Sequence, residues 1–472
     1  MRMFRLNCMK HIWKLRIYCI LFTVTAAAAL CSCGTEPGDL NVILVTIDTL
    51  RADHMSCYGY GRNTTPNIDA LALEGVLFEK ATVNWPKTTP SMASMLTGTY
   101  GRTNGVIGGC RQDLPLELIT VAEVMKKHSF ATGAVVNNAN LGREFQFDQG
   151  FDEHVEIWKK PPPADASVVT DNALDWLKRS GKKNFFLWVH YIAPHAVYSP
   201  PKPFNTMFLN DKIYLKTSGK KLPVRNTYEK AIHRKKAYVK PHRLHSYYVA
   251  QYDGEIAWVD SQFKRVIDHL KKSGLFDKTL LILTSDHGEE LGEHDIYYEH
   301  GFNVYEATMH VPLIIVYPER IPGKKRIKER MLLVDLFPTI MDYVGISGPR
   351  QLEGRSLKPL IEGKSRGAGY LFSEGGYPHG KTDKFHTVVY SEPYKLIHKR
   401  NDKWEFYDLE KDPEEQEKLN KKKRHVFLKH RRVLQKWEQS HTVTRLQEKK
   451  EKTEKKLSRE TEEQLKALGY VE

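Results

Sequence analysis

The sequence predicts an α/β fold with a large, mostly parallel central sheet, helices on both faces and a small C-terminal antiparallel α+β subdomain. Two observations predict it. Apolar, β-branched runs alternate with amphipathic segments between residues 41 and 345, as in sheets whose strands are buried on both faces. Beyond about residue 365, short alternating runs separated by turn residues replace that pattern, which favours an antiparallel sheet.

The elements follow in order along the chain. "NVILVTID" (41–48) is a continuous apolar run and opens the sheet as a buried strand. Further strands are expected at 131–136, 184–192, 278–286 and 311–318. Helices are expected at 65–78, from Pro90 to Gly98, and at 118–129, 169–180, 247–274 and 332–345. In the subdomain, the short strands are expected at 369–374, 385–390, 394–399 and 403–409.

Two segments depart from this alternation. Residues 203–243 are basic, lack clear periodicity and exceed ordinary loop length, which indicates an insertion near a strand end. Residues 421–472 are highly charged with sparse apolar positions. They fit either an extended helix with a weak apolar seam or a solvated charged tail.

The N-terminus has the features of an export signal. Five Lys/Arg in residues 1–16 precede an apolar run of 14 residues, which is shorter than the roughly 20 residues that span a bilayer. "LCSCG" follows and is similar to a bacterial lipobox, so Cys33 is predicted to carry the lipid after removal of residues 1–32. The protein is then exported and lipid-anchored to the bacterial cell envelope, in the periplasm or on the outer surface. A plain secretory signal or an uncleaved anchor are the alternatives.

The basic character of the chain is confined to segments. The formal net charge is +15, but residues 1–16, 210–243 and 418–457 together carry +25, so the remainder carries −10. No nucleic-acid-binding motif accompanies these segments, and nucleic acid is not an expected partner. Two cysteines remain in the body of the chain, Cys57 and Cys110, and they fit either a disulfide or two buried thiols.

A short stretch, "WPKTTPSMASMLTG" (85–98), reads as a loop that feeds a helix. Thr88 and Thr89 stand directly before Pro90, which is tolerated in a first helical turn. A helix N-terminus attracts anions, so a hydroxyl there could meet a phosphate or sulfate group. The same threonines fit an ordinary helix cap. Lys87 precedes them and is read as a solvated surface lysine, with anion binding as the alternative.

Two predicted strands end in side chains of the types that bind metal ions. Asp48 ends the first strand, and Asp286 and His287 end the strand at 278–286. Sites in open α/β sheets form outside the carboxyl ends of strands, so the three side chains converge if these strands are neighbours. Carboxylate and imidazole donors suit a divalent cation of the Ca, Mn or Zn class. Taken singly, Asp48 also fits a turn residue, and Asp286 with His287 also fits a helix cap.

Several motifs in the right order now resemble the sulfatase family of the alkaline phosphatase superfamily. They are "VTIDTLRADHMSCYGYGRNTTPNIDALALEGVLFEKA", "TTPSMASMLTG", "LTSDHGEELGEH", "YEATMHVPLIIVYP" and "FYDLEKDPEEQEKLN". The resemblance implies an alkaline phosphatase-like fold, a catalytic domain over 33–364, a C-terminal subdomain over 365–420 and a helical tail over 421–472. It also implies an enzyme, either a sulfuric or a phosphoric ester hydrolase.

The chain departs from that family at the nucleophile. Typical sulfatases carry Cys-x-Pro-x-Arg, in which the cysteine becomes formylglycine, whereas positions 88–92 read Thr-Thr-Pro-Ser-Met. The chain is similar here to phosphoryl-transfer relatives that use threonine, so Thr88 is the expected nucleophile and a further metal ligand. His195 and His300 fall where the family places substrate-contacting or acid groups. Thr49 and Ala193 stand where relatives have further carboxylates, which favours one metal ion.

Three functions remain open on these residues. The first is a hydrolase of a sulfated or phosphorylated small molecule, glycan or lipid. The second is a phospho-alcohol transferase acting on a glycan or lipid. The third is a non-catalytic, anion-binding lipoprotein. A threonyl ester cannot collapse to an aldehyde as a formylglycine hydrate does, so a threonine nucleophile suits phosphoryl transfer better.

Overall fold

The structure is a computed structural model, and it describes residues 40–107, 112–160, 165–181, 183–217, 244–376, 385–441 and 457–468. The predicted signal segment with Cys33, the second cysteine Cys110 and residues 218–243 of the insertion lie outside these ranges. Cys57 is a free thiol. Within the described ranges, no helix combines the length and the apolar character needed to cross a bilayer.

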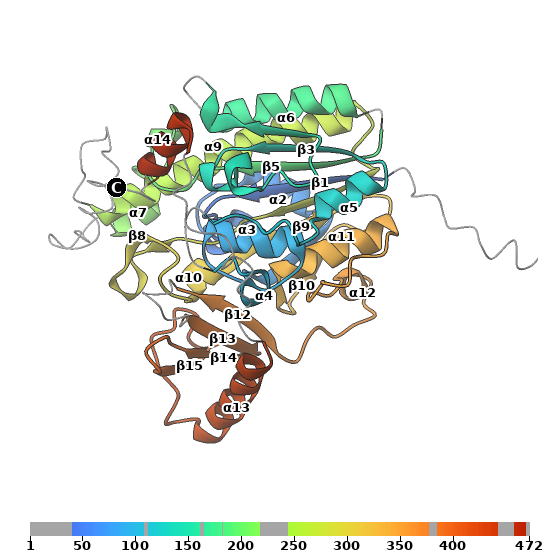
Figure 1. The fold of residues 1–472 in the computed structure, drawn as a ribbon. Helices are drawn as coiled ribbons and strands as arrows, with labels where there is room; N and C mark the ends of the chain where they lie inside the picture. Colours follow the sequence, from blue (N-terminus) through green and yellow to red (C-terminus); the bar gives the residue numbers. More distant parts are fainter. Residues whose placement is uncertain are drawn as a thin grey trace, which may run out of the picture.

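A mixed, mostly parallel sheet forms the centre of the molecule (Figure 1). In the described residues it has nine strands in the order β10-β2-β9-β6-β1-β5-β3-β4, and β11 also pairs with β2. Every pairing is parallel except those of β9 with β2 and β6. The strands are β1 (Asn41–Ile47), β2 (Val76–Thr82), β3 (Ala131–Val136), β4 (Glu153–Glu156), β5 (Phe185–Tyr191), β6 (Thr279–Thr284), β9 (His310–Val316), β10 (Lys325–Ile327) and β11 (Met331–Leu332).

Helices cover both faces of this sheet, which confirms the predicted fold class. Alternate residues of β1 belong to different apolar clusters: Leu44 lies on one face, and Ile43 and Val45 lie on the other. The Leu44 face is covered by α3 (Thr88–Thr97), α5 (Val121–Lys127) and α11 (Leu336–Val344). The opposite face is covered by α2 (Pro66–Ala72), α6 (Ala166–Ser180) and α9 (His245–Lys272).

The helix predicted over 65–78 is wrong in its second half. The helix α2 ends at Ala72, and the residues from Val76 onward form β2. Gly75 separates the two, and a Cβ there would lie 2.3 Å from the backbone oxygen of Ile315, so only glycine lets the chain approach β9 this closely. The residues "VLFEKAT" pair with β9 as a strand. Tertiary contacts therefore outweigh the local helical pattern here.

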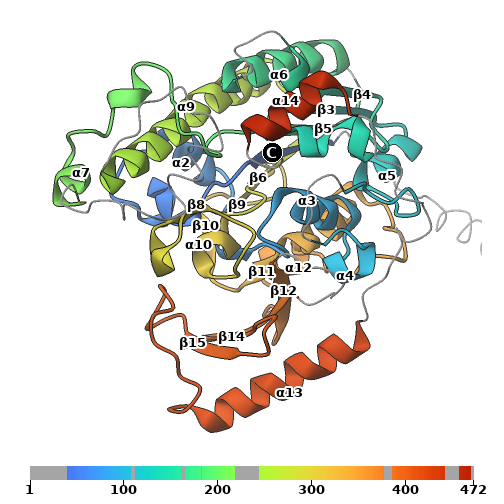
Figure 2. The same cartoon turned by 60° about the vertical axis from the view of Figure 1, so that its left-hand side comes forward.

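A four-stranded antiparallel sheet confirms the predicted C-terminal subdomain (Figure 2). Its strands are β12 (Leu371–Gly375), β13 (His386–Ser391), β14 (Tyr394–His398) and β15 (Trp404–Asp408). One face, which includes Val388 and Ile397, joins the core of the main body. The other face packs against Leu434 and Trp437 of α13 (Arg424–Ser440).

The described parts of the charged tail are packed helices, so the solvated-tail interpretation is wrong for them. The helix α13 covers the small sheet, whereas α14 (Arg459–Ala467) returns to the main body. Leu465 of α14 is fully buried in the main core, and the indole N–H of Trp158 donates to the Thr461 hydroxyl at 3.4 Å. The buried apolar residues of these two helices therefore act as anchors, those of α13 on the small sheet and Leu465 of α14 on the main body.

Shorter elements connect these layers. The strands β7 (Glu290–Leu291) and β8 (Tyr297–Glu299) form a ribbon beside the end of β6. The short helices are α4 (Gly101–Asn104), α7 (Lys212–Thr217), α10 (Glu306–Met309) and α12 (Lys358–Ile361).

Candidate active site

Three predicted ligands meet at the carboxyl ends of β1 and β6. The two strands are parallel neighbours, with Thr46 opposite Thr284, so the residues that follow them leave the sheet at one edge. Nε2 of His287 lies 3.8 Å from Oδ1 of Asp48 and 3.6 Å from Oδ2 of Asp286. All three side chains are fully buried, and one ligand atom from each falls within 4.8 Å of the others.

Thr88 joins this group from the start of α3. It is the first residue of the helix, and its Oγ1 lies 3.2 Å from Nε2 of His287. The N-cap position is Lys87, and no side chain caps the helix, so the capping interpretation of the threonines is not supported at Thr88. The hydroxyl of Ser91 donates to the Asp286 carbonyl at 2.6 Å and ties the first turn of α3 to the end of β6.

The neighbouring backbone determines which nitrogen of His287 carries the proton. Nδ1 lies 2.9 Å from the carbonyl oxygen of Gly288, and a carbonyl can only accept, so Nδ1–H donates there. Neutral His287 therefore directs the unprotonated Nε2 toward the site. In this structure Nε2 accepts a hydrogen bond from the Thr88 hydroxyl. A metal ion would use the same lone pair.

The donor set fits a divalent cation. Oδ1 of Asp48 and Oδ2 of Asp286 are buried and accept no hydrogen bond from the described residues. Burial, followed by the Asp286 carboxylate, raises the pKa of Asp48 well above its ordinary value. Two buried carboxylates this close need a compensating positive charge, and the His287 nitrogen completes an oxygen and imidazole donor set.

Two further side chains lie against Asp48, and the sequence analysis missed both. The amide of Asn138 donates to Oδ2 of Asp48 at 2.8 Å, and Nε2 of His190 lies 3.4 Å from the same oxygen. Burial lowers the pKa of His190 to about 4, so this imidazole is neutral at physiological pH. The pairing of β5 with β1 would have indicated His190, because this register places His190 opposite Thr46, two residues before Asp48. No sequence signal pointed to Asn138.

The structure also brings His195 and His300 to this site. The His300 ring lies 4.4 Å from the His287 ring and 5.0 Å from the His195 ring, measured between centroids. Nδ1 of His300 contacts Oε1 of the fully buried Glu289 at 2.8 Å. Nδ1–H of His195 donates to the Ala196 carbonyl at 2.8 Å. Both imidazoles are therefore oriented by partners on the side away from their Nε2 atoms.

The interpretation of Lys87 as a solvated surface residue is wrong. Its side chain is only 1% exposed and lies directly before Thr88. A buried lysine usually has a charge partner, so Lys87 is a structured part of the segment that leads into Thr88 and not a solvated surface residue. Met92, where typical sulfatases have arginine, is fully buried in the apolar core and brings no charge.

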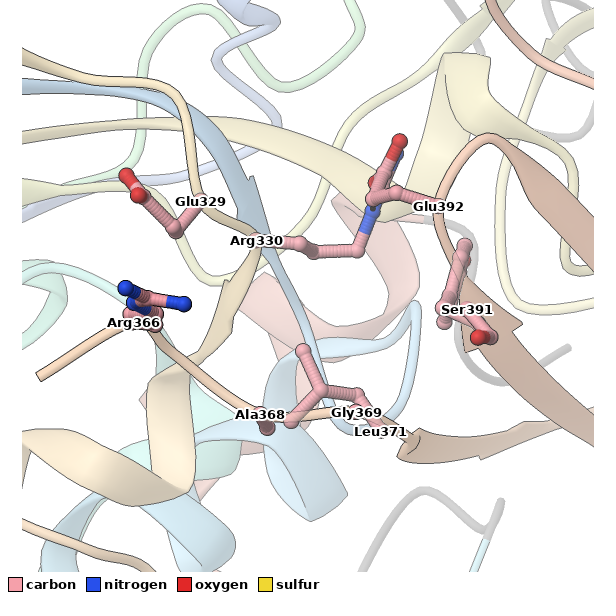
Figure 3. A pocket seen from close by; sticks show the side chains of 9 residues that line it. Glu329, Arg330, Arg366, Ala368, Gly369, Leu371, Ser391 and Glu392 are labelled. Carbon is pink, nitrogen blue, oxygen red and sulfur yellow. Dashed lines mark hydrogen bonds and ion pairs between the residues drawn. The ribbon is translucent and has the colours of Figure 1, made fainter.

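A separate cavity of about 280 Å³ lies where β11, β12 and β13 meet (Figure 3). Arg330 extends into it, but its guanidinium is already engaged by Glu392 at 2.7 Å and Glu306 at 3.0 Å. None of the residues that line this cavity belongs to the cluster around Thr88. The candidate chemistry therefore rests on the strand-end cluster.

Comparison with known proteins identifies the family and the fold. The family model described as sulfatase matches residues 40–346, and that of the N-sulphoglucosamine sulphohydrolase C-terminal region matches residues 292–441. The chain is 26% identical to an N-acetylglucosamine-6-O-sulfatase of Bacteroides thetaiotaomicron, over 83% of this chain and 85% of that protein. It is also 26% identical to a multifunctional alkaline phosphatase superfamily protein of Trinickia caryophylli, over 79% of this chain and 90% of that one. Among solved structures, a phosphonate monoester hydrolase of Agrobacterium radiobacter superimposes with a TM-score of 0.69 at 22% identity, covering 88% of this chain and 98% of that one.

Proposed function

The chain belongs to the sulfatase family of ester hydrolases, and from this premise we propose that it cleaves sulfate or phosphate esters with Thr88 as nucleophile. Asp48, Asp286 and His287 would hold one divalent cation, and Thr88 would be a further ligand. The observation that carries this proposal is the Thr88 hydroxyl, 3.2 Å from His287 at the N-terminus of α3. The family's usual cysteine is absent there, and the threonine hydroxyl is in the position from which a nucleophile would act.

The reaction proceeds in two steps. Oγ1 of Thr88 loses its proton and bonds to the sulfur or phosphorus atom, while the bond from that atom to the ester oxygen breaks. The departing alkoxide takes a proton and leaves as an alcohol. Water then bonds to the same central atom and gives up a proton, the bond from that atom to Oγ1 of Thr88 breaks, Thr88 takes a proton back, and sulfate or phosphate is released.

Each group at the site has a distinct task in these steps. When bound, the cation lowers the pKa of the attacking hydroxyl and neutralises charge on the substrate oxygens. The first turn of α3 presents backbone N–H groups toward the same anion. His195 and His300 contact the substrate or protonate the leaving group, and Glu289 keeps His300 in a fixed orientation through the 2.8 Å contact.

The substrate is a sulfated or phosphorylated small molecule, glycan or lipid. A relative named as an N-acetylglucosamine-6-O-sulfatase supports a sulfated sugar, and a solved fold relative named as a phosphonate monoester hydrolase supports a phosphorus ester. The lipobox-like "LCSCG" supports attachment through Cys33 to the envelope, where such glycans and lipids are accessible. The segment with Cys33 lies outside the described residues.

A substrate panel tests the proposed function. Purified protein is assayed with matched aryl sulfate, aryl phosphate and aryl phosphonate esters, each with Ca²⁺, Mn²⁺ or Zn²⁺ and after chelation. We expect sustained, metal-dependent turnover of a phosphorus ester. The aryl sulfate should give a stoichiometric burst followed by slow release, because a threonyl sulfate must be cleaved by attack on sulfur.

The alternatives give different results in the same assay. Product formation that rises with an added alcohol, with transfer of the group to that alcohol, identifies a transferase. Tight binding of the esters with no cleavage under any metal contradicts the proposed activity and supports the anion-binding alternative.

A further inference from the structure

We propose that a buried hydrogen-bond chain, from Trp188 through Thr46 to His190, positions Asp48 so that its Oδ1 atom is the one offered to a cation. The three residues of this chain are positioning residues, since they act through Asp48 and do not touch the substrate. The inference rests on the proposed metal binding and extends it to residues to which the sequence analysis gave no role.

The strand pattern places all four side chains on one face of the sheet. Thr46 lies in β1, and Asp48 follows two residues later, directly after the strand ends. Trp188 and His190 are likewise two residues apart, both within β5. Residues two apart on a strand share a face. The parallel register sets Thr46 opposite His190, so the side chains are cross-strand neighbours. All four are fully buried.

The contacts form one continuous line. The indole N–H of Trp188 donates to Oγ1 of Thr46 at 2.9 Å. Oγ1 of Thr46 lies 2.8 Å from Nδ1 of His190, and Nε2 of the same ring lies 3.4 Å from Oδ2 of Asp48. The first two contacts are hydrogen bonds, whereas the last is a close approach of the His190 ring to the carboxylate, outside hydrogen-bond geometry.

The donors and acceptors of these side chains determine the direction of the hydrogen bonds along the chain. An indole N–H can only donate, so the Thr46 oxygen accepts at that contact. The Thr46 hydroxyl still has its own proton, and among the described residues Nδ1 of His190 is the one further contact of its oxygen. The hydroxyl therefore donates to Nδ1, and the proton of the neutral imidazole lies on Nε2, which faces Asp48.

This direction determines how Asp48 is presented. Oδ2 receives the amide N–H of Asn138 at 2.8 Å and faces the N–H of His190 at 3.4 Å. Oδ1 accepts no hydrogen bond from the described residues and lies 3.8 Å from Nε2 of His287. In the opposite tautomer, the Nε2 lone pair of His190 would face a carboxylate oxygen, and the Thr46 hydroxyl would lose its acceptor. The first change would set a lone pair against Oδ2 and so disturb the orientation of Asp48.

Thr46→Val tests the chain, because valine keeps the shape of threonine and removes its hydroxyl. The measurement is calorimetric titration of the metal-free protein with whichever of Ca²⁺, Mn²⁺ or Zn²⁺ the wild type binds. We expect about a 10-fold loss of affinity, the size typical of a residue that orients a metal ligand. Thr46→Ser keeps the hydroxyl and should bind within about 2-fold of wild type.

Thr279→Val is the matched control for a lost buried hydroxyl. Thr279 lies at the opposite end of β6 and donates to the Leu275 carbonyl at 2.7 Å, so this variant should bind the ion as the wild type does. An unchanged affinity in Thr46→Val overturns the proposal. If affinity falls in His190→Gln alone and not in Thr46→Val, the His190 ring is itself a ligand and the positioning role is wrong.

A spectroscopic measurement on the wild type keeps the test independent of folding and of metal binding. Nitrogen-15 chemical shifts of selectively labelled histidine, with His190 identified by its absence in His190→Gln, report which ring nitrogen carries the proton. We expect the proton on Nε2. A proton on Nδ1 overturns the proposal. A wild type that shows the Nε2 tautomer but binds no divalent cation contradicts the proposed function and leaves the direction of the chain intact.

Discussion

Replacing Thr88 with alanine is expected to lower turnover of the best ester substrate by about 10⁴-fold or more, the scale of losing a covalent nucleophile. The hydroxyl lies 3.2 Å from His287, and no other hydroxyl of the described chain is shown in contact with this nitrogen. Metal binding and substrate binding should both persist, because the carboxylates and His287 remain. The measurement is kcat and KM with calorimetric substrate binding on the same preparation.

The neighbouring residue supplies the matched control for this substitution. Thr89→Ala makes the same chemical change one position along α3, in an equally buried side chain, and should stay within about 3-fold of the wild-type rate. Thr88→Ser restores a hydroxyl and should recover part of the activity. Equal losses in Thr88→Ala and Thr89→Ala would show that α3 packing, and not the nucleophile, was disturbed.

Asp48→Asn is expected to remove metal-induced stabilisation without destabilising the metal-free protein. Burial and the Asp286 carboxylate raise the pKa of Asp48, so its ionised form costs free energy in the metal-free fold above its unfolded pKa, and this cost grows as the pH rises. Asparagine removes that charge. In the wild type, an ion at about 100 times its Kd adds about 2.7 kcal/mol to the free energy of unfolding, and in the variant this gain should be near zero.

Thermal unfolding with and without the ion at pH 7 measures both effects. Turnover should fall by about 10³-fold, corresponding to several kcal/mol of lost transition-state stabilisation. Asp335→Asn is the control, because Asp335 is also a buried carboxylate, with its pKa raised to about 6 by burial, but it accepts backbone N–H groups remote from the cluster. A variant at Asp48 that keeps the full metal-induced shift would contradict its assignment as a ligand.

The sequence predicted the fold and the convergence of the three central side chains because both depend on strong local patterns. Buried strands appear as apolar runs, and the residue that follows such a run leaves the sheet at a known edge. Asp48, Asp286 and His287 were therefore placed together once β1 and β6 were neighbours. The prediction of a helix over 65–78 is wrong in its second half because Gly75 and the partner strand β9 determine where the helix ends.

The side chains that lie against Asp48 could not be predicted from the sequence. The role of His190 depends on the register of β5 against β1, and that of Asn138 on the path of a loop after β3. Burial of Lys87 depends on packing around the start of α3, which no local pattern reports. The anchoring of α14 through Leu465 likewise needs a surface more than three hundred residues away in the chain.

Detection of a covalent adduct on Thr88 is the most direct measurement of the central claim. The enzyme is quenched with acid during turnover of an aryl phosphate and of an aryl sulfate, digested, and sequenced by mass spectrometry. The account predicts a phosphoryl or sulfuryl group on Thr88, absent in Thr88→Ala and accumulating with the sulfate ester. Sustained turnover with an unmodified Thr88 peptide at every quench time, or a modification on another residue, would contradict it.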